Sequence, residues 1–288
     1  MLLDHELRGR LDRLSLMTHG RVRSVYTGRH ASRHLGESLD FADYREYVPG
    51  DDFRKIDHQL WARLGQVLVR RFEAEEDLTL TVLIDATASM GMYGKFDVAR
   101  RIAAIVSYLA LSSGDRVVPV LLGGSDRQVT RGPIGRHRSA WPHIERWLEG
   151  LSPAGAAPLA PAIRGVVGPV AGSGAVVVIS DLLDAEWERA LDGAGLGVGG
   201  VVAHVLAPEE LDPGLVGDLR LVDVETGAAV EASTSSSVLD AYAAAVASFI
   251  AGVAGRSRRG GLDHVLVRVD DEAGERFLRR LVEAAAVT

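Results

Sequence analysis

From residue 77 onward, short apolar runs alternate with longer amphipathic segments. The runs have the length of strands and are rich in Val, Ile and Leu, whereas the segments between them have helical spacing. Uniformly apolar, β-branched strands separated by helices indicate a mostly parallel sheet that is covered on both faces. The expected strands are 78–84, 116–123, 175–180, 201–206 and 264–269, and the expected helices are 95–111, 139–149, 159–168, 185–191, 238–254 and 272–285.

The first 76 residues follow a different pattern. Six leucines between residues 2 and 16 fall near helical spacing, which predicts an amphipathic helix over residues 2–17. Residues 20–76 are polar and rich in Arg, Asp and Tyr, and we expect strands and loops that lie over another domain. We therefore predict an N-terminal helix and extension, residues 1–76, packed on a doubly wound α/β domain with three layers of the Rossmann type, residues 77–288.

Three local patterns refine this picture. The segment "QVLVRRFEAEEDL" (66–78) begins as a strand and ends as a polar linker. Residues 219–231 predict a β-hairpin that turns at Glu225–Gly227. The segment "GLGVGG" (195–200) matches G-x-G-x-x-G, but it follows a helix and precedes a strand, which is the reverse of the dinucleotide-binding context. We interpret it as a flexible connection.

Composition and charge limit the classes of function. The chain has no cysteine, which excludes disulfides, thiolate metal sites and cysteine nucleophiles. Residues 1–72 carry 13 basic and 10 acidic residues, but no basic patch is interleaved with aromatic residues, so we expect no nucleic acid partner. The N-terminus has no apolar signal core and the longest apolar runs are strand-sized, so we expect a cytoplasmic protein without a membrane span.

The candidate chemistry lies in "LTLTVLIDATASMG" (78–91), where an apolar run ends at Asp85. Asp85, Thr87 and Ser89 alternate, so a loop that curls over the strand end points their oxygens to one side. Asp181 ends the run "AVVVIS" in the same way. Ligands of open parallel sheets bind beyond the carboxyl ends of strands. One carboxylate and two hydroxyls suit Mg²⁺ or Mn²⁺, although in an isolated D-x-T-x-S these side chains more often cap local backbone.

A catalytic alternative uses the same serine. The segment "TASMG" comes within one residue of the G-x-S-x-G nucleophile elbow, and Ser89, Asp181 and His204 or His264 occur in the order of a hydrolase. However, Thr87 replaces the first glycine, His204 lies inside a predicted strand, and His264 lies near the start of one. No P-loop and no H-E-x-x-H motif occur in the sequence.

The block "YREYVPGDDFRKID" (44–57), within the stretch 36–90, resembles the DUF58 family, whose core is a von Willebrand factor A-like domain. Four later stretches are similar to that family as well: "GDRV" (114–117), "VVVISDLLD" (176–184), "HVLAPEELD" (204–212) and "LVDVETG" (221–227). The resemblance therefore covers most of the chain.

The resemblance implies a metal-ion-dependent adhesion site. Asp85, Thr87 and Ser89 match its D-x-S-x-S element, and Asp181 matches its later acidic ligand. In that fold the strands that end at Asp85 and Asp181 are adjacent. The usual loop threonine is missing, because Ala157 occupies its position, and this removes one oxygen ligand. The alternatives are a site of reduced affinity for Mg²⁺ or Mn²⁺ and a fold retained as a metal-free scaffold.

The resemblance also implies a function. Such sites bind an acidic residue of a partner rather than catalyse, so we expect a non-enzymatic adaptor that works with a MoxR-type AAA+ ATPase in chaperone-like protein maturation. In the block 44–57, the side chains of Arg45, Tyr47, Asp52 and Arg54 are candidates for partner binding, with internal salt bridges as the favoured alternative. The Ala-, Gly- and Arg-rich composition suggests a bacterial protein from a GC-rich genome.

Overall fold

The computed structural model describes residues 1–17, 41–48, 56–72, 78–124, 129–170, 174–195, 199–215, 217–270 and 272–287. The chain divides into two compact units. Unit 1 comprises Met1–His30 and Leu78–Thr288, and unit 2 comprises Ala31–Asp77. Both units contain regular structure, and unit 1 holds the α/β fold that the sequence predicts.

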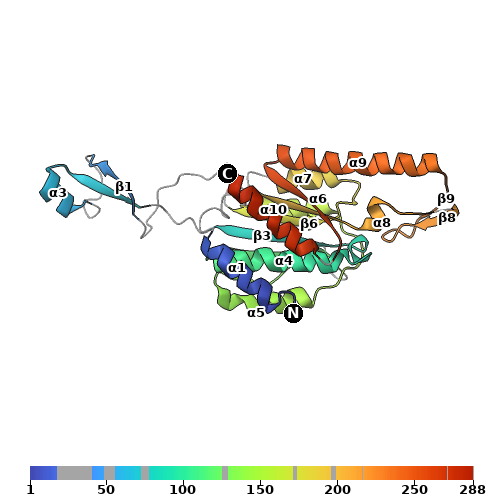
Figure 1. Cartoon of the computed structure of the whole chain (residues 1–288), viewed down its shortest axis with the longest axis horizontal. Helices are drawn as coiled ribbons and strands as arrows, with labels where there is room; N and C mark the ends of the chain where they lie inside the picture. Colours follow the sequence, from blue (N-terminus) through green and yellow to red (C-terminus); the bar gives the residue numbers. More distant parts are fainter. Residues whose placement is uncertain are drawn as a thin grey trace. The chain divides into compact units, whose positions relative to one another are not determined.

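A six-stranded sheet forms the centre of unit 1, with the strand order β10-β7-β6-β3-β4-β5 (Figure 1). Its five long strands are parallel, and the short β5 at the edge runs antiparallel to β4. The sheet therefore has the mostly parallel arrangement expected of strands that alternate with helices. The strands are β3 (Thr79–Ala86), β4 (Arg116–Gly123), β5 (Val129–Arg131), β6 (Ala175–Ser180), β7 (Gly199–Leu206) and β10 (Leu262–Arg268).

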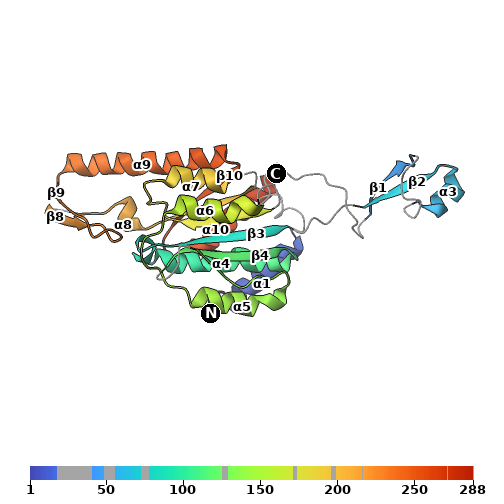
Figure 2. The ribbon, with the colours of Figure 1, turned by 180° about the vertical axis from the view of Figure 1, so that it is seen from behind.

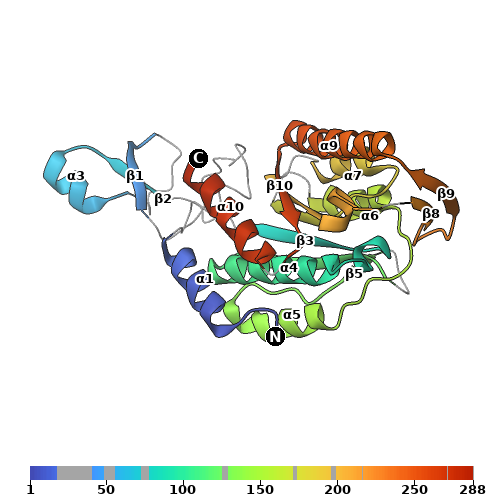
Figure 3. The ribbon, with the colours of Figure 1, turned by 45° about the vertical axis from the view of Figure 1, so that its right-hand side comes forward.

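Helices cover both faces of this sheet, which gives the three layers of a doubly wound fold (Figure 2). One face packs against α1 (His5–Met17), α4 (Lys95–Ser112), α5 (Trp141–Glu149) and α10 (Ala273–Val287). The other face packs against α6 (Leu159–Val167), α7 (Trp187–Ala194) and α9 (Ser236–Arg259). Both α1 and α10 lie against α4, so the first and the last helix meet on the same central helix (Figure 3).

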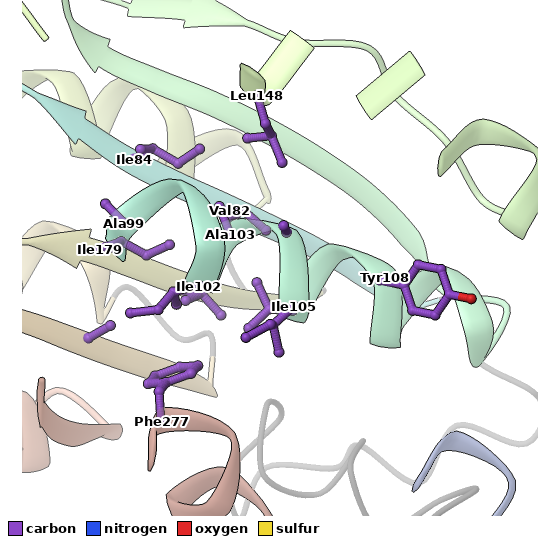
Figure 4. Close-up of a cluster of buried hydrophobic side chains, with 14 of the residues drawn as sticks. Val82, Ile84, Ala99, Ile102, Ala103, Ile105, Tyr108, Leu148, Ile179 and Phe277 are labelled. Atoms are coloured by element: carbon purple, nitrogen blue, oxygen red, sulfur yellow. The ribbon is translucent and has the colours of Figure 1, made fainter. Parts of the chain in front are cut away.

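Side chains of β3 alternate between two hydrophobic clusters. Val82 and Ile84 join the cluster under α4, where they meet Ile102 and Phe277, whereas Leu83 points to the opposite cluster (Figure 4). This alternation follows from the two-residue period of a strand. Because both faces are covered, β3 is buried along nearly its whole length, and its apolar residues Val82, Leu83 and Ile84 run without a break up to Asp85.

The expected elements agree with the structure to within a few residues. Strand β6 has the predicted bounds, and the predicted hairpin is formed by β8 (Gly217–Val222) and β9 (Ala229–Thr234). Helix α9 begins and ends beyond its predicted range of 238–254, because Ser235 caps it and its N-terminal half extends past the core. Strand β5 and the short α8 (Pro208–Leu211) were not predicted, because both are too short to show a periodic pattern of apolar residues.

Unit 2 contains a two-stranded antiparallel sheet and a helix. Strand β1 (Phe41–Glu46) pairs with β2 (Leu68–Phe72), and α3 (His58–Leu64) lies between them in the chain. Strand β2 is the strand that the sequence predicted at the start of 66–78. The helix was not predicted. Asp57 accepts a hydrogen bond from the backbone N–H of Leu60 and so caps its first turn.

Helix α9 has the length and composition of a membrane-crossing helix, although little of its surface is buried in the protein. Length and composition alone are weak grounds for a span. Among the described residues, Ser236–Arg259 is the one helix that is long and apolar enough to cross a membrane.

Candidate functional site

The predicted site residues Asp85 and Asp181 lie at the carboxyl ends of neighbouring strands. Strands β3 and β6 pair in parallel with Ile84 opposite Ile179, which places Asp85 beside the end of β6. The predicted adjacency of these strands is therefore confirmed. Both carboxylates are almost completely buried, each with 1% of its surface exposed.

Hydrogen bonds bring the oxygens of Asp85, Thr87 and Ser89 together. Asp85 Oδ1 accepts from the backbone N–H of Thr87 at 2.9 Å and from Thr87 Oγ1 at 2.8 Å. Thr87 Oγ1 lies 3.0 Å from Ser89 Oγ. On the other side, Asp85 Oδ2 accepts from Ser180 Oγ at 2.5 Å. The alternation in the sequence thus gathers three oxygens, and β6 contributes a fourth that the sequence did not suggest.

Burial, and after it the nearby negative charge of Asp181, raise the pKa of Asp85 to about 7. The hydrogen bonds from Ser180 and Thr87 oppose both effects, because they stabilise the ionised carboxylate. Two buried, ionised carboxylates repel each other, and a nearby positive charge offsets this repulsion.

Lys95 supplies that positive charge. Its Nζ donates to Asp181 Oδ2 at 2.7 Å and also to Glu210 Oε1, and its side chain has no exposed surface. Burial by itself lowers the pKa of Lys95, but the charges and hydrogen bonds of Asp181 and Glu210 outweigh that effect and raise the pKa above its ordinary value. The ammonium is therefore a fixed internal cation at the edge of the site.

Lys95 and Glu210 were not predicted as site residues from the sequence. Lys95 is the first residue of α4, where the helix dipole disfavours a positive charge, and the two carboxylates offset this at the same helix end. A signal was present in the composition, because the chain has only two lysines among its 32 basic residues. A compact ammonium fits a buried point between two carboxylates better than a planar guanidinium does.

The two loops that carry the site are strained. In the described parts of the chain, Tyr93 (φ 54°) and Leu182 (φ 53°) are the residues other than glycine with a positive φ. One lies between Ser89 and Lys95, and the other directly follows Asp181. Such strain is concentrated at functional sites in proteins. The same loops expose Met92, Tyr93 and Leu183, so apolar side chains lie on the surface close in sequence to the polar residues.

The histidines of the hydrolase alternative face each other and the backbone. His204 Nε2 lies 3.1 Å from the carbonyl oxygen of Asp181, and His204 Nδ1 lies 3.2 Å from His264 Nε2. Burial, and after it the neighbouring His264, lower the pKa of His204 to about 3. Both ring nitrogens of His204 are thus engaged away from Ser89, whose hydroxyl pairs with Thr87.

The loop expected to hold the missing threonine lies against the site. The N–H of Ala88 donates to the carbonyl of Gly155 at 2.8 Å, and the N–H of Ala154 donates to the carbonyl of Ala86 at 2.9 Å. Ala157 follows in this loop and is buried. Within the described residues, no three His, Cys, Asp or Glu side chains lie together so that they could hold a metal ion, so any cation site here depends on hydroxyls.

The candidate partner-binding residues lie in unit 2. The backbone N–H of Tyr47 donates to the carbonyl of Val67 at 2.9 Å, and Arg45 pairs with Val69 in the β1–β2 ladder. Asp52 and Arg54 lie outside the described residues. Their roles in binding or in internal salt bridges stay predictions.

Replacing Lys95 with Met removes the ammonium and keeps most of the side-chain volume. We expect a loss of about 3–5 kcal/mol in the free energy of unfolding, because Asp181 is left buried without its partner. Urea denaturation measures this loss. The control is Arg116→Met, at an exposed position at the start of β4, which should change stability by less than about 0.5 kcal/mol. A similarly small loss in both variants would contradict the buried ion pair.

Comparison with known proteins identifies the family. The family model described as "Protein of unknown function DUF58" matches residues 43–249, which is more than half of the chain. An uncharacterized protein of Mycobacterium tuberculosis and one of Mycobacterium bovis are each 29% identical to this chain over 276 residues. The alignments cover 93% of this chain and 86% of each relative, and these relatives support the expected bacterial origin. The chain therefore belongs to the DUF58 family.

Proposed function

We propose that this protein is a non-enzymatic interaction module of the von Willebrand factor A type. The observation that carries the proposal is the group of oxygens from Asp85, Thr87 and Ser89 at the end of β3, beside Asp181 at the end of β6. The exposed side chains of Met92 and Leu183 on the same loops give the polar centre apolar neighbours. Exposed apolar side chains next to polar groups are typical of surfaces that bind other proteins.

The donor set fits a hard divalent cation in part. The Asp85 carboxylate and the hydroxyls of Thr87 and Ser89 are within hydrogen-bond distance of one another, and oxygen ligands of this kind suit Mg²⁺ or Mn²⁺ with several waters retained. In this role the three side chains hold the ion and Asp181 supports it. The ion would leave a position for a carboxylate of the partner, which it binds by charge.

Two features weaken the affinity for such an ion. Ala157 offers a methyl group where the resemblance implies a threonine hydroxyl. Lys95 already neutralises Asp181, so less negative charge remains at the site to attract a metal cation. We therefore propose a weak site, formed chiefly by Asp85, Thr87 and Ser89.

The hydrolase alternative has less support. A serine nucleophile needs a base within hydrogen-bond reach, with a third group that orients the base. The hydroxyl of Ser89 pairs with Thr87, while His204 contacts the backbone of Asp181 and His264. Neither histidine contact therefore places a proton acceptor next to Ser89.

The proposed partner is a MoxR-type AAA+ ATPase, with which the protein would remodel or mature other proteins. The support is the resemblance of the block 44–57 and of the later stretches to the family. Unit 2 holds most of that block, and Tyr47 in it is partly exposed.

Calorimetric titration of the metal-stripped protein with Mg²⁺, and then with Mn²⁺, tests the proposed ion site. We expect weak, saturable binding that Asp85→Ala abolishes, because the only carboxylate of the chief donor set is lost. Ala157→Thr should strengthen binding by restoring a hydroxyl. Ala157→Val has nearly the same size without the oxygen and should not. Equal affinities of the Thr and Val variants, or no binding in any of them, would overturn the ion site.

A fluorophosphonate probe separates the interaction module from the hydrolase. We expect no covalent adduct, because no histidine activates Ser89, and we expect Ser89→Ala to weaken capture of a MoxR-type ATPase in a pull-down. A serine hydrolase treated in parallel shows that the probe is active. An adduct that forms on the unaltered protein and disappears in Ser89→Ala would establish the hydrolase instead.

A further inference from the structure

Residues 208–215 and 217–245 form a projection that we call the arm. It consists of α8, the β8–β9 hairpin and the N-terminal half of α9, and it lies beyond the carboxyl end of the central sheet (Figures 1 and 3). Within the described residues, β8 and β9 form a sheet with each other alone. A two-stranded hairpin is marginally stable at best without further packing.

The hairpin has one apolar face and one polar face. Leu219 pairs with Ala232 and Leu221 pairs with Val230, and residues that pair directly across antiparallel strands share a face. On the other face, Arg220 pairs with Glu231 and Ser233 donates to Asp218, and only the pair of Val222 and Ala229 next to the turn is apolar. This pattern is that of a hairpin with one buried side.

The apolar face is nevertheless open to solvent. Leu221 is 48% exposed and Val230 is 64% exposed. Further large apolar side chains of the arm are also exposed: Leu215, Val222, Val224, Val238 and Tyr242. Exposed apolar side chains that gather in one place mark sites of interaction, whereas scattered ones need no explanation.

The arm is also strongly acidic. Eight acidic residues and one basic residue, Arg220, give residues 208–245 a net charge of −7, which equals the net charge of the whole chain. The remaining 250 residues are therefore neutral as a sum. This acidic charge favours basic partners for the apolar face, because like charges oppose association and opposite charges speed it.

We propose that the arm binds a protein surface on which basic side chains surround apolar ones. An apolar partner covers Leu221 and Val230, and Lys or Arg at its rim pair with the acidic residues of the arm. Nucleic acids and anionic membranes would meet seven net negative charges, so neither fits. A second copy of the chain would bring an equally acidic arm.

The arm is joined to the site described above. Tyr242 of α9 donates through its hydroxyl to the carbonyl oxygen of Glu210 at 2.7 Å, and the carboxylate of Glu210 accepts from Lys95. The arm therefore reaches the ion pair of Lys95 and Asp181 through Glu210. This docking surface goes beyond the proposed function, because it uses neither a cation nor the oxygens of Asp85, Thr87 and Ser89.

The test uses the full chain and a synthetic amphipathic helical peptide built from Leu and Lys. Fluorescence anisotropy at low and high salt measures its dissociation constant, alongside the same peptide with Glu in place of each Lys. We expect saturable binding of the Leu/Lys peptide that weakens with salt, and much weaker binding of the Leu/Glu peptide. Equal binding of the two peptides, or no binding of either, would overturn the proposal.

Two sets of variants locate the binding. The double variant Leu221→Ser/Val230→Ser should raise the dissociation constant by about tenfold or more, because apolar anchors dominate interface affinity. Glu225→Gln/Glu231→Gln should weaken binding mainly at low salt. The control is Ile134→Ser, at an apolar position that is 49% exposed and lies outside the arm, and it should bind like the unaltered chain. An equal effect of Ile134→Ser would overturn the assignment to the arm.

Two further measurements distinguish other occupants. Flotation with phosphatidylglycerol vesicles detects a lipid surface, and sedimentation equilibrium detects a second copy. We expect neither vesicle binding nor self-association. Vesicle binding or self-association that disappears in Leu221→Ser/Val230→Ser would assign the apolar face to that occupant and overturn the basic protein partner.

Discussion

Lys95 holds a positive charge in the interior of the protein, between Asp181 at the end of β6 and Glu210 in α8. Removing an ammonium and a carboxylate from water costs several kcal/mol for each, so such a pair persists only where hydrogen bonds satisfy both groups. Here Asp181 Oδ1 also accepts from the backbone N–H of Leu183, and Glu210 Oε2 accepts from that of Ala207. The ion pair fixes the beginning of α4 to the ends of β6 and β7, which places the candidate site.

This constraint connects two surfaces of different character. The site contains buried carboxylates and hydroxyls, and its electrostatics are balanced within the chain by Lys95. Apart from Glu210, the acidic side chains of the arm are exposed or partly exposed, and the arm's own sequence offers only Arg220 as a positive charge. Glu210 belongs to both, because its carboxylate faces Lys95 and its carbonyl accepts from Tyr242. A change at either surface therefore has a short path of contacts to the other.

The apolar pattern was sufficient to predict the parallel sheet, since β3, β4, β6 and β7 are largely buried on both faces and helices separate the long strands. The alternation of Asp85, Thr87 and Ser89 was likewise sufficient to predict that their oxygens meet. The pairing of Lys95 with Glu210 was not predictable, because 115 residues separate them and only the strand order brings them together. A helix over 238–254, within α9, was predicted, but the exposure of its N-terminal half was not, because its many alanines mark no distinct apolar face.

The central claim is that a cation of the chain itself balances the carboxylates of this site. A double-mutant cycle with Lys95→Met and Asp181→Asn, followed by urea denaturation, tests it most directly. We expect a coupling energy of at least about 2 kcal/mol, with the double variant more stable than the sum of the single losses implies, because Lys95→Met leaves Asp181 buried without its cation and the double variant does not. Losses that add to within about 0.5 kcal/mol would contradict the account.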